Sequence, residues 1–261
     1  MTNIKAGNIL LHCKVDGEGK ACCFLHGSYL DGMFWQEQTP AFSKRFITIV
    51  PDLCGHGQSD KPKEEYTPEL MAKDVHNLLK ALGIKQTILI GHSLGCRIAL
   101  QTVLDYPEIV EKLVLSNGNA GPVQGRADIF PENVKREIGF GLPSFDLEKY
   151  IYYEVWFSFA NPDHDKVQLI HEKILGTPDY VKASIGRHFS KLDLRSRLSE
   201  IRVPSLVITG EKDVICPMES SEYMAEHIPD ARFVVISDVG HCLPVEKPNE
   251  FNSKVLSFLE N

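Results

Sequence analysis

Short apolar segments alternate with segments of helical periodicity over most of this 261-residue chain. Several apolar segments lack the polar alternation of a half-exposed strand, as expected where helices cover both faces of a sheet. They lie at residues 20–25, 46–50, 87–90, 112–115, 205–209 and 232–236. This strand–helix alternation predicts an α/β fold with a mostly parallel sheet flanked by helices.

The segments around these strands carry recognisable start and stop signals. Thr67-Pro68-Glu69 combines a capping residue, a first-turn proline and an early acid, and Gly83 ends the helix that follows. Further helices are expected at residues 94–104, 218–228 and 249–259. Residues 8–15 alternate apolar and polar positions before a glycine-rich turn, which predicts a hairpin with the next strand.

Residues 120–198 interrupt this rhythm, since they contain helical patches and many aromatic residues but no convincing strand. We expect a helical cap at 120–198, inserted into a core domain formed by residues 1–119 and 199–261. The aromatic side chains have two interpretations: they fill the insertion's own core, or some of them line a pocket.

Charge and cysteine usage exclude several classes of protein. The formal net charge is −7 and no basic run is present, so we expect neither nucleic acid nor an anionic membrane as a partner. No stretch approaches the roughly 18 apolar residues of a membrane span, and the amino terminus lacks a signal-peptide core. Seven cysteines without a Cys-x-x-Cys pair predict free thiols and a cytoplasmic protein.

The stretch Gly91-His-Ser-Leu-Gly95 lies where an apolar segment gives way to a helix. A serine in such a turn is strained and projects away from the sheet, while flanking glycines allow strand and helix to approach closely. The amino terminus of the helix adds unpaired N–H groups and a partial positive charge. Ser93 is therefore the candidate nucleophile.

A serine hydroxyl needs a base, and His241 is the best-placed histidine. It lies in a loop after the last strand, on the side where Ser93 is expected to project. His92 is adjacent to Ser93, but we expect it to point to the opposite side of the turn.

The carboxylate that orients such a histidine is expected just past the end of a strand. Asp213 fits, because it follows the segment at 205–209 and precedes His241 by one helix and one strand. Glu211 is a rival in the same loop, and Asp238 is close to the histidine in sequence. Alternatively, Asp213 only caps the helix after Pro217.

Acyl transfer also needs donors for the oxyanion. One is the backbone N–H of Leu94, which follows the nucleophile. The other is the backbone N–H of Ser28, since Gly27 allows the loop after an early strand to approach the site. We interpret the neighbouring His26 as structural.

The order Ser93, Asp213, His241, with His26-Gly27 upstream, resembles the α/β-hydrolase fold superfamily over nearly the whole chain. Its small bacterial members have stretches similar to those at residues 51–59, 91–95, 210–213 and 240–241. The resemblance implies an eight-stranded sheet with a helical cap over the triad. Ser93 argues against haloalkane dehalogenases and epoxide hydrolases, whose matching residue is Asp. Cys96 departs from the usual glycine or alanine, and is expected to tighten packing behind the turn.

These residues predict a serine hydrolase that cleaves a small carboxylic ester, as a monomer or homodimer without metal or organic cofactor. Similar enzymes include lactonases, such as 3-oxoadipate enol-lactonases, and C–C bond hydrolases, so these activities stay open. A ligand sensor with slow turnover is an alternative of another class. A substrate carboxylate would need a cation, for which the candidates are Arg97, Arg126, Arg136 and Arg187.

Overall fold

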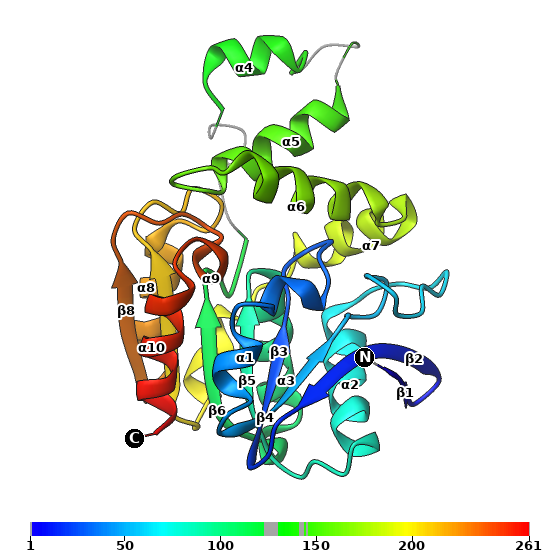
Figure 1. Ribbon diagram of the computed structural model, residues 1–261, viewed down its shortest axis with the longest axis vertical. Coiled ribbons are helices and arrows are strands. Elements are labelled where there is room, and N and C mark those ends of the chain that lie inside the picture. Colours follow the sequence, from blue (N-terminus) through cyan, green and yellow to red (C-terminus); the bar gives the residue numbers. More distant parts are fainter. Residues whose placement is uncertain (1, 123–129, 141–143, 145, 261) are drawn as a thin grey trace.

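The computed structural model describes residues 2–122, 130–140, 144 and 146–260. Its centre is an eight-stranded sheet in the order β1-β2-β4-β3-β5-β6-β7-β8 (Figure 1). The strands are β1 Thr2–Ala6, β2 Ile9–Asp16, β3 Lys20–Leu25, β4 Phe46–Pro51, β5 Thr87–His92, β6 Val110–Ser116, β7 Ser205–Gly210 and β8 Ala231–Ile236. Only β2 pairs antiparallel with its neighbours, β1 and β4, in this described sheet. The predicted mostly parallel, eight-stranded α/β fold is confirmed.

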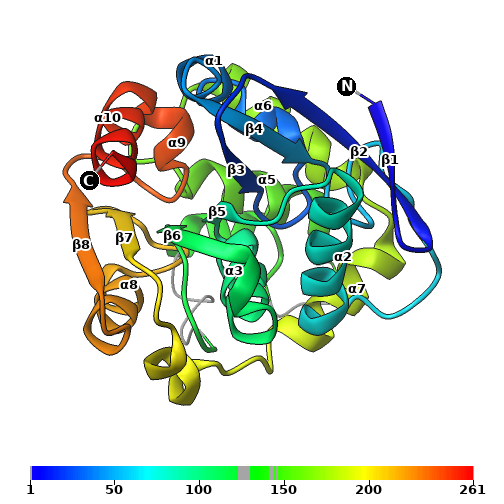
Figure 2. The ribbon, with the colours of Figure 1, turned by 90° about the horizontal axis from the view of Figure 1, so that it is seen from below.

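Helices cover both faces of the sheet, with α2, α3 and α8 on one side and α1, α9 and α10 on the other (Figure 2). The core helices are α1 Thr39–Phe42, α2 Pro68–Ala81, α3 Leu94–Asp105, α8 Met218–His227, α9 Leu243–Glu246 and α10 Pro248–Leu259, with 3-10 helices η1 Gly32–Trp35, η2 Pro107–Ile109 and η4 Arg195–Glu200. Helix α2 has the predicted signals, since the Thr67 side chain accepts from the Leu70 N–H. No described helix combines the length and apolarity needed to cross a bilayer.

The sheet separates two hydrophobic clusters, because successive side chains of a strand point to opposite faces. Along β3, Cys23 and Leu25 join the cluster that contains α2 and α3. Cys22 and Phe24 join the other cluster, which packs against α1 and α10. This double burial explains why β3 contains no polar alternation.

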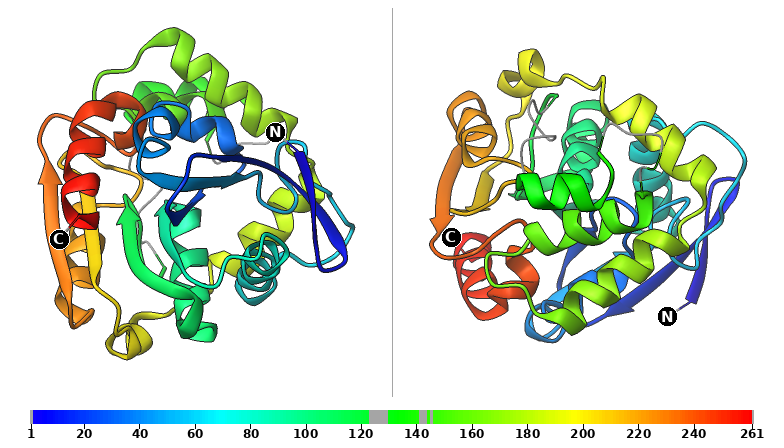
Figure 3. Two further views of the ribbon diagram at one scale, coloured as in Figure 1. Left: turned by 60° about the horizontal axis from the view of Figure 1, so that its bottom comes forward. Right: turned by 90° about the horizontal axis from the view of Figure 1, so that it is seen from above.

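The four described α-helices between β6 and β7 lie above the carboxyl edge of the sheet (Figure 1), and from above they cover the middle of the core (Figure 3). They are α4 Glu132–Glu137, α5 Leu147–Phe157, α6 His164–Gly176 and α7 Asp179–Phe189. Phe130 packs against the rings of Tyr150 and Phe157, so these described aromatics fill the core of the insertion itself.

The seven cysteines are all buried and free, as their number and spacing predicted. They are Cys13, Cys22, Cys23, Cys54, Cys96, Cys216 and Cys242. Burial raises the pKa of the Cys13, Cys54 and Cys242 thiols to about 12, so these groups are neutral at physiological pH.

Candidate active site

Ser93 occupies the single-residue turn between β5 and α3, with φ 52° and ψ −113°. A positive φ is uncommon for any residue with a Cβ atom, and such strained backbone clusters at functional sites. The turn lies at the carboxyl edge of the sheet, beneath the helices that follow β6 (Figure 1). Ser93 therefore lies at the strained strand-to-helix position that the sequence predicted.

The two glycines around Ser93 are required by close backbone approach. A Cβ at Gly91 would lie 2.4 Å from the Gly95 carbonyl oxygen. A Cβ at Gly95 would lie 2.1 Å from the Leu25 carbonyl oxygen. No side chain fits at either distance, so the turn can form only with glycine at both positions.

Cys96 packs directly behind the turn. Its thiol lies 3.1 Å from the Gly91 carbonyl oxygen and 3.2 Å from that of Ser116, and donates toward both strands. The Cys96 side chain, where glycine or alanine is usual, fills space that Gly118 leaves open. A Cβ at Gly118 would lie 2.5 Å from the Cys96 sulfur.

His241 and Asp213 form a buried hydrogen-bonded pair. His241 Nδ1 lies 2.9 Å from Asp213 Oδ2, and the Asp213 side chain has no exposed surface. Burial by itself would raise the pKa of Asp213, but the facing histidine and the hydrogen bonds to the carboxylate outweigh it and lower the pKa. An ionised Asp213 fixes the proton of His241 on Nδ1, which leaves Nε2 as the basic atom.

The loop after β7 holds Asp213 in place. Asp213 Oδ1 accepts from the backbone N–H groups of Ile215 at 2.9 Å and Cys216 at 2.8 Å. The capping residue of α8 is Pro217, so Asp213 does not act as the helix cap. One carboxylate oxygen thus orders the loop while the other faces the histidine.

The rival carboxylates lie elsewhere. Glu211 accepts a hydrogen bond from the backbone N–H of Asp238 at 3.2 Å. The Asp238 carboxylate pairs with Lys212 at 2.6 Å, on an exposed part of the surface. Neither of these acids contacts His241 through a hydrogen bond in the described residues.

Ser93, His241 and Ser28 line one cavity of about 130 Å³. The loop of Gly27 and Ser28 approaches Ser93 closely, since a Cβ at Gly27 would be only 3.4 Å from the Ser93 Cβ. Leu94, with Ser93 and Ser28, lines a second cavity of about 190 Å³. As the first residue of α3, Leu94 has an N–H without a carbonyl partner inside the helix. The structure thus places Ser28, Leu94 and His241 beside Ser93, with Asp213 behind His241.

Two other histidines support the site without facing Ser93 as bases. His26 Nε2 accepts from the Leu53 N–H at 2.9 Å, and burial lowers the pKa of His26 to about 4, so it is neutral and structural as expected. His92 lies beside His241, with ring centroids 4.8 Å apart and its Nε2 donating to the His241 carbonyl at 3.0 Å. His92 packs on Phe34 and Trp35 and holds the His241 loop, so its ring acts as a support for that loop.

Asn117 is a site residue that the sequence analysis missed. Its side-chain amide donates to Asp213 Oδ2 at 2.9 Å and to the Gly240 carbonyl at 3.2 Å. Its φ is 52°, in the left-handed region that asparagine tolerates better than most residues. The available signal was its position directly after β6, since the other site residues also follow strands.

Ser158 and Glu246 were also missed. The Ser158 carbonyl, at the end of α5, accepts from the His241 N–H at 2.6 Å. Glu246 accepts from the backbone N–H groups of Gly240 and Ala160, each at 2.9 Å. No local sequence pattern identifies the Ser158–His241 or the Ala160–Glu246 contact, because each joins the insertion to the core segment around His241.

The described candidate arginines bind protein groups. Arg97 donates to one side-chain amide and two backbone carbonyls. Arg187 pairs with Glu65 at 3.0 Å, Arg136 donates weakly within its own helix at 3.4 Å, and Arg126 lies outside the described residues. A substrate carboxylate would have to displace these partners. Within the described ranges, no group of three or more His, Cys, Asp or Glu side chains could hold a metal ion.

A family model for the α/β-hydrolase fold matches residues 21–152 and 176–248. The chain belongs to the α/β-hydrolase fold family. This α/β-hydrolase is 28% identical to the 2-hydroxy-6-oxo-6-phenylhexa-2,4-dienoate hydrolase of Comamonas testosteroni, over 97% of this chain and 92% of that one.

Solved structures of other α/β-hydrolases are also similar. A thermophilic esterase from Thermogutta terrifontis matches with a TM-score of 0.84 and 28% identity, over 99% of this chain and 97% of that one. Est816, described as an N-acyl homoserine lactone degrading enzyme, matches with a TM-score of 0.86 and 26% identity, over 98% and 100% of the two chains. The protein is thus an α/β-hydrolase with esterase and lactone-degrading relatives at low identity.

Proposed function

We propose that this α/β-hydrolase is a serine hydrolase that cleaves small carboxylic esters through an acyl-enzyme on Ser93. One observation carries the proposal: the strained Ser93 shares a cavity with His241, whose Nδ1 is hydrogen-bonded to the buried Asp213. A strained serine beside an oriented histidine gives a fold no stability, but it supplies a nucleophile and its base. The esterase and lactone-degrading relatives add support.

In the first step, His241 Nε2 removes the Ser93 proton as the serine oxygen attacks the ester carbonyl carbon. The resulting oxyanion accepts from the backbone N–H groups of Leu94 and Ser28. Asp213 stabilises the imidazolium without taking its proton. His241 then gives that proton to the leaving alcohol, and the acyl group stays on Ser93. Each oxyanion donor contributes about 3 kcal/mol of barrier reduction.

In the second step, water replaces the alcohol. His241 takes a proton from the water as its oxygen attacks the acyl-enzyme carbonyl, and the same backbone groups hold the second oxyanion. Collapse breaks the bond to Ser93, whose oxygen recovers the proton from His241. The products are one carboxylic acid and one alcohol per ester and water consumed, so the enzyme returns unchanged.

A lactone is the second candidate substrate, supported by the similarity to Est816. The first step is the same, but the leaving alcohol stays attached to the acyl chain. The deacylating water must then share the cavity with that hydroxyl group. A C–C bond substrate is a third possibility, supported by the dienoate hydrolase relative.

The test is hydrolysis of p-nitrophenyl esters from acetate to octanoate by the wild type and Ser93→Ala, with Ser237→Ala as control. Ser237 is exposed after β8, so its loss leaves the rate unchanged. We expect turnover in the wild type and the control, and a loss of at least about 10⁴-fold in Ser93→Ala.

The outcomes separate the alternatives. Activity that survives in Ser93→Ala would remove Ser93 from the mechanism. Ring opening of an N-acyl homoserine lactone without ester turnover would favour a lactonase. A stable adduct on Ser93, seen by mass spectrometry without turnover, would favour a ligand sensor.

A further inference from the structure

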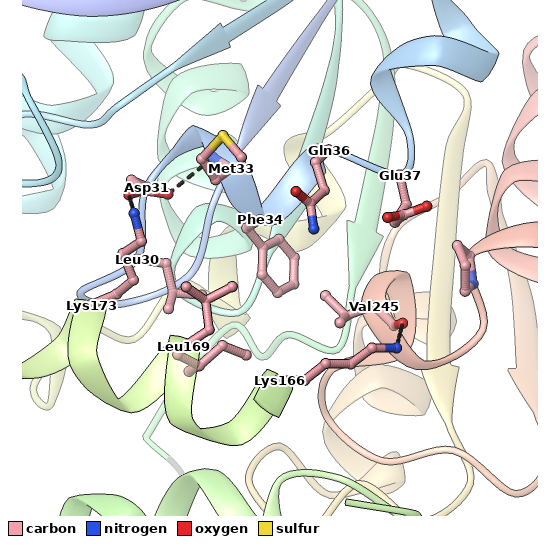
Figure 4. A pocket seen from close by; sticks show the side chains of 12 residues that line it. Leu30, Asp31, Met33, Phe34, Gln36, Glu37, Lys166, Leu169, Lys173 and Val245 are labelled. Atoms are coloured by element: carbon pink, nitrogen blue, oxygen red, sulfur yellow. Dashed lines mark hydrogen bonds and ion pairs between the residues drawn. The ribbon is translucent and has the colours of Figure 1, made fainter. Parts of the chain in front are cut away.

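A larger cavity lies next to the one around Ser93, on the outer side of α6. Its volume is about 250 Å³, against about 130 Å³ for the cavity that contains Ser93 and His241. We call it the outer cavity; its walls come from η1 and the residues around it, from α6, and from the α9–α10 corner (Figure 4). None of the mechanism above uses it.

Two side chains form a common wall between the cavities. Leu30 and Ile170 line both the outer cavity and the Ser93 cavity. Phe34 extends this wall, since its ring lines the outer cavity and stacks on His92 with centroids 4.4 Å apart. His92 in turn lines the Ser93 cavity. Leu30, Ile170 and the stacked rings of Phe34 and His92 therefore lie between the outer cavity and the Ser93 cavity.

The cavity that Ser93 shares with His241 holds only part of a long acyl chain. A protein cavity of about 150 Å³ holds one benzene molecule, so about 130 Å³ accommodates a group of roughly six heavy atoms. A longer tail must extend beyond this cavity, and the shared wall of Leu30 and Ile170 offers an apolar route. Leucine changes rotamer readily, whereas the β-branched Ile170 is stiffer, so Leu30 is the movable side of this wall.

The lining of the outer cavity selects an apolar, uncharged tail. Figure 4 shows Phe34 at its centre, with Leu169 and Val245 nearby. Its charges balance: Asp31 and Lys173 are paired, and Glu37 and Lys166 lie at the opposite end. The lining has no net charge to attract a charged tail, because its two lysines are matched by two carboxylates.

A second cavity beside Ser93 is more polar than the shared wall. Arg97, Asn119 and Ser190 line it together with apolar side chains, among them Leu94, Ile185 and Phe189. Its polar groups suit the alcohol half of an ester or the ring oxygen side of a lactone, an orientation that directs the acyl tail toward Leu30 and Ile170.

We propose that the outer cavity binds the distal end of an aliphatic acyl tail, and that Leu30 and Ile170 control its passage from Ser93. The substrate class is esters or lactones of medium-chain, uncharged carboxylic acids. This inference rests on the proposed function, since it assumes that the acyl carbon is attacked by Ser93.

The experiment compares kcat/KM for p-nitrophenyl butyrate and octanoate. Each methylene group buried in apolar surroundings contributes a factor of about four, so the wild type should prefer octanoate by at least tenfold. Leu169→Trp fills the outer cavity from its rim, where Leu169 is 49% exposed and the fold tolerates a larger side chain. We expect it to lower the octanoate-to-butyrate ratio at least tenfold.

Leu175→Trp is the matched control. Leu175 is also an exposed leucine of α6 but does not line the outer cavity. The octanoate-to-butyrate ratio of kcat/KM for Leu175→Trp should therefore equal that of the wild type. A wild type without octanoate preference, or a Leu169→Trp ratio equal to that of Leu175→Trp, would overturn the proposal. Failure of the proposed function would give a different result. The wild type would not hydrolyse the butyrate ester, or Ser93→Ala would still hydrolyse it.

A binding measurement gives the same comparison without turnover. Calorimetry with sodium octanoate and sodium butyrate, in the Ser93→Ala background, should show octanoate binding at least tenfold more tightly. Adding Leu169→Trp should remove most of that difference. Equal affinities for the two acids would overturn the tail site regardless of the esterase result.

Discussion

The backbone N–H of His241 donates a 2.6 Å hydrogen bond to the carbonyl oxygen of Ser158. Ser158 follows α5 in the insertion, so the proposed base is attached to the helices that cover it rather than to the core alone. A Cβ at Gly240 would lie 2.4 Å from the same carbonyl, which shows how closely the two segments approach. Movement of α5 would therefore move His241.

Glu246→Gln should loosen this connection. The carboxylate accepts from the N–H groups of Gly240 and Ala160, and a glutamine has only one acceptor oxygen. The unpaired N–H should destabilise the fold by about 1–3 kcal/mol and displace His241. We expect the melting temperature to fall by several degrees and kcat for butyrate ester by about tenfold.

Glu250→Gln is the control for this change. Glu250 pairs with Lys247 at 3.5 Å on the exposed surface, where such a pair contributes less than about 1 kcal/mol. Thermal melts and kcat should match the wild type within error. Equal behaviour of the two variants would refute a positioning role for Glu246.

Asn117→Gly should weaken catalysis more than stability. It removes the 2.9 Å hydrogen bond to Asp213 but keeps a residue that accepts the positive φ. Hydrogen bonds to charged groups contribute about 1.5–3 kcal/mol, so we expect kcat to fall between about tenfold and a hundredfold. Asn117→Ala should show the same kcat and an additional loss of stability of about 1–2 kcal/mol. Wild-type kcat in both variants would exclude Asn117 from the site.

Gly95→Ala should prevent folding. The added Cβ would lie 2.1 Å from the Leu25 carbonyl oxygen. The backbone can relieve this clash only if α3 moves away from β3. We expect a loss above about 4 kcal/mol, measured by circular dichroism and urea unfolding. Gly186→Ala in α7 is the control, since its Cβ meets nothing within 4 Å and should stabilise the protein by about 0.5–1 kcal/mol. A folded Gly95→Ala protein would contradict the packing described for the turn.

Three buried histidines predict that stability falls in mild acid. Burial lowers the pKa of His26 to about 4 and of His56 and His92 to about 3. The unfolded chain binds these protons near pH 6.5, so between pH 6.5 and 4 it holds more protons than the folded chain. These three histidines should therefore lower the unfolding free energy as pH falls below 6.5, by about 2 kcal/mol each at pH 5, while Asp74, whose pKa burial raises to about 7, offsets part of this loss.

Urea titrations at pH 8, 6.5 and 5 measure this dependence. His56→Gln should reduce the loss of unfolding free energy between pH 8 and pH 5, because it removes one histidine with a lowered pKa. His227→Gln, at an exposed position, should leave the loss unchanged. A wild type as stable at pH 5 as at pH 8 would contradict the neutral state assigned to these rings.

Local signals were sufficient for the parts of the site that lie at strand ends. Ser93, Asp213 and His241 each follow a strand, and parallel strands bring such positions to one edge of the sheet. Asn117 obeys the same rule after β6 and was predictable in principle. The polarity of a strand therefore gives the location of site residues without any knowledge of the helices above them.

Contacts that cross between the core and the insertion could not be predicted. Ser158 reaches the His241 loop, and Ala160 reaches Glu246 of α9, only because α5 is oriented in a particular way over the sheet. Periodicity gives the buried face of a helix but not its direction over a sheet. The hydrogen bond of His92 was not predictable for a related reason, since it joins His92 to the distant His241 loop.

The segment that leaves the core after β6 begins and ends at two residues that are hydrogen-bonded to each other. The Leu194 N–H donates to the Ala120 carbonyl oxygen at 2.7 Å, and the strands on either side, β6 and β7, are neighbours in the sheet. The segment between those two residues can therefore be exchanged between relatives without breaking a strand pair, provided that the Ser158 carbonyl that holds His241 is kept. Such an exchange measures directly how much of the substrate preference the segment carries.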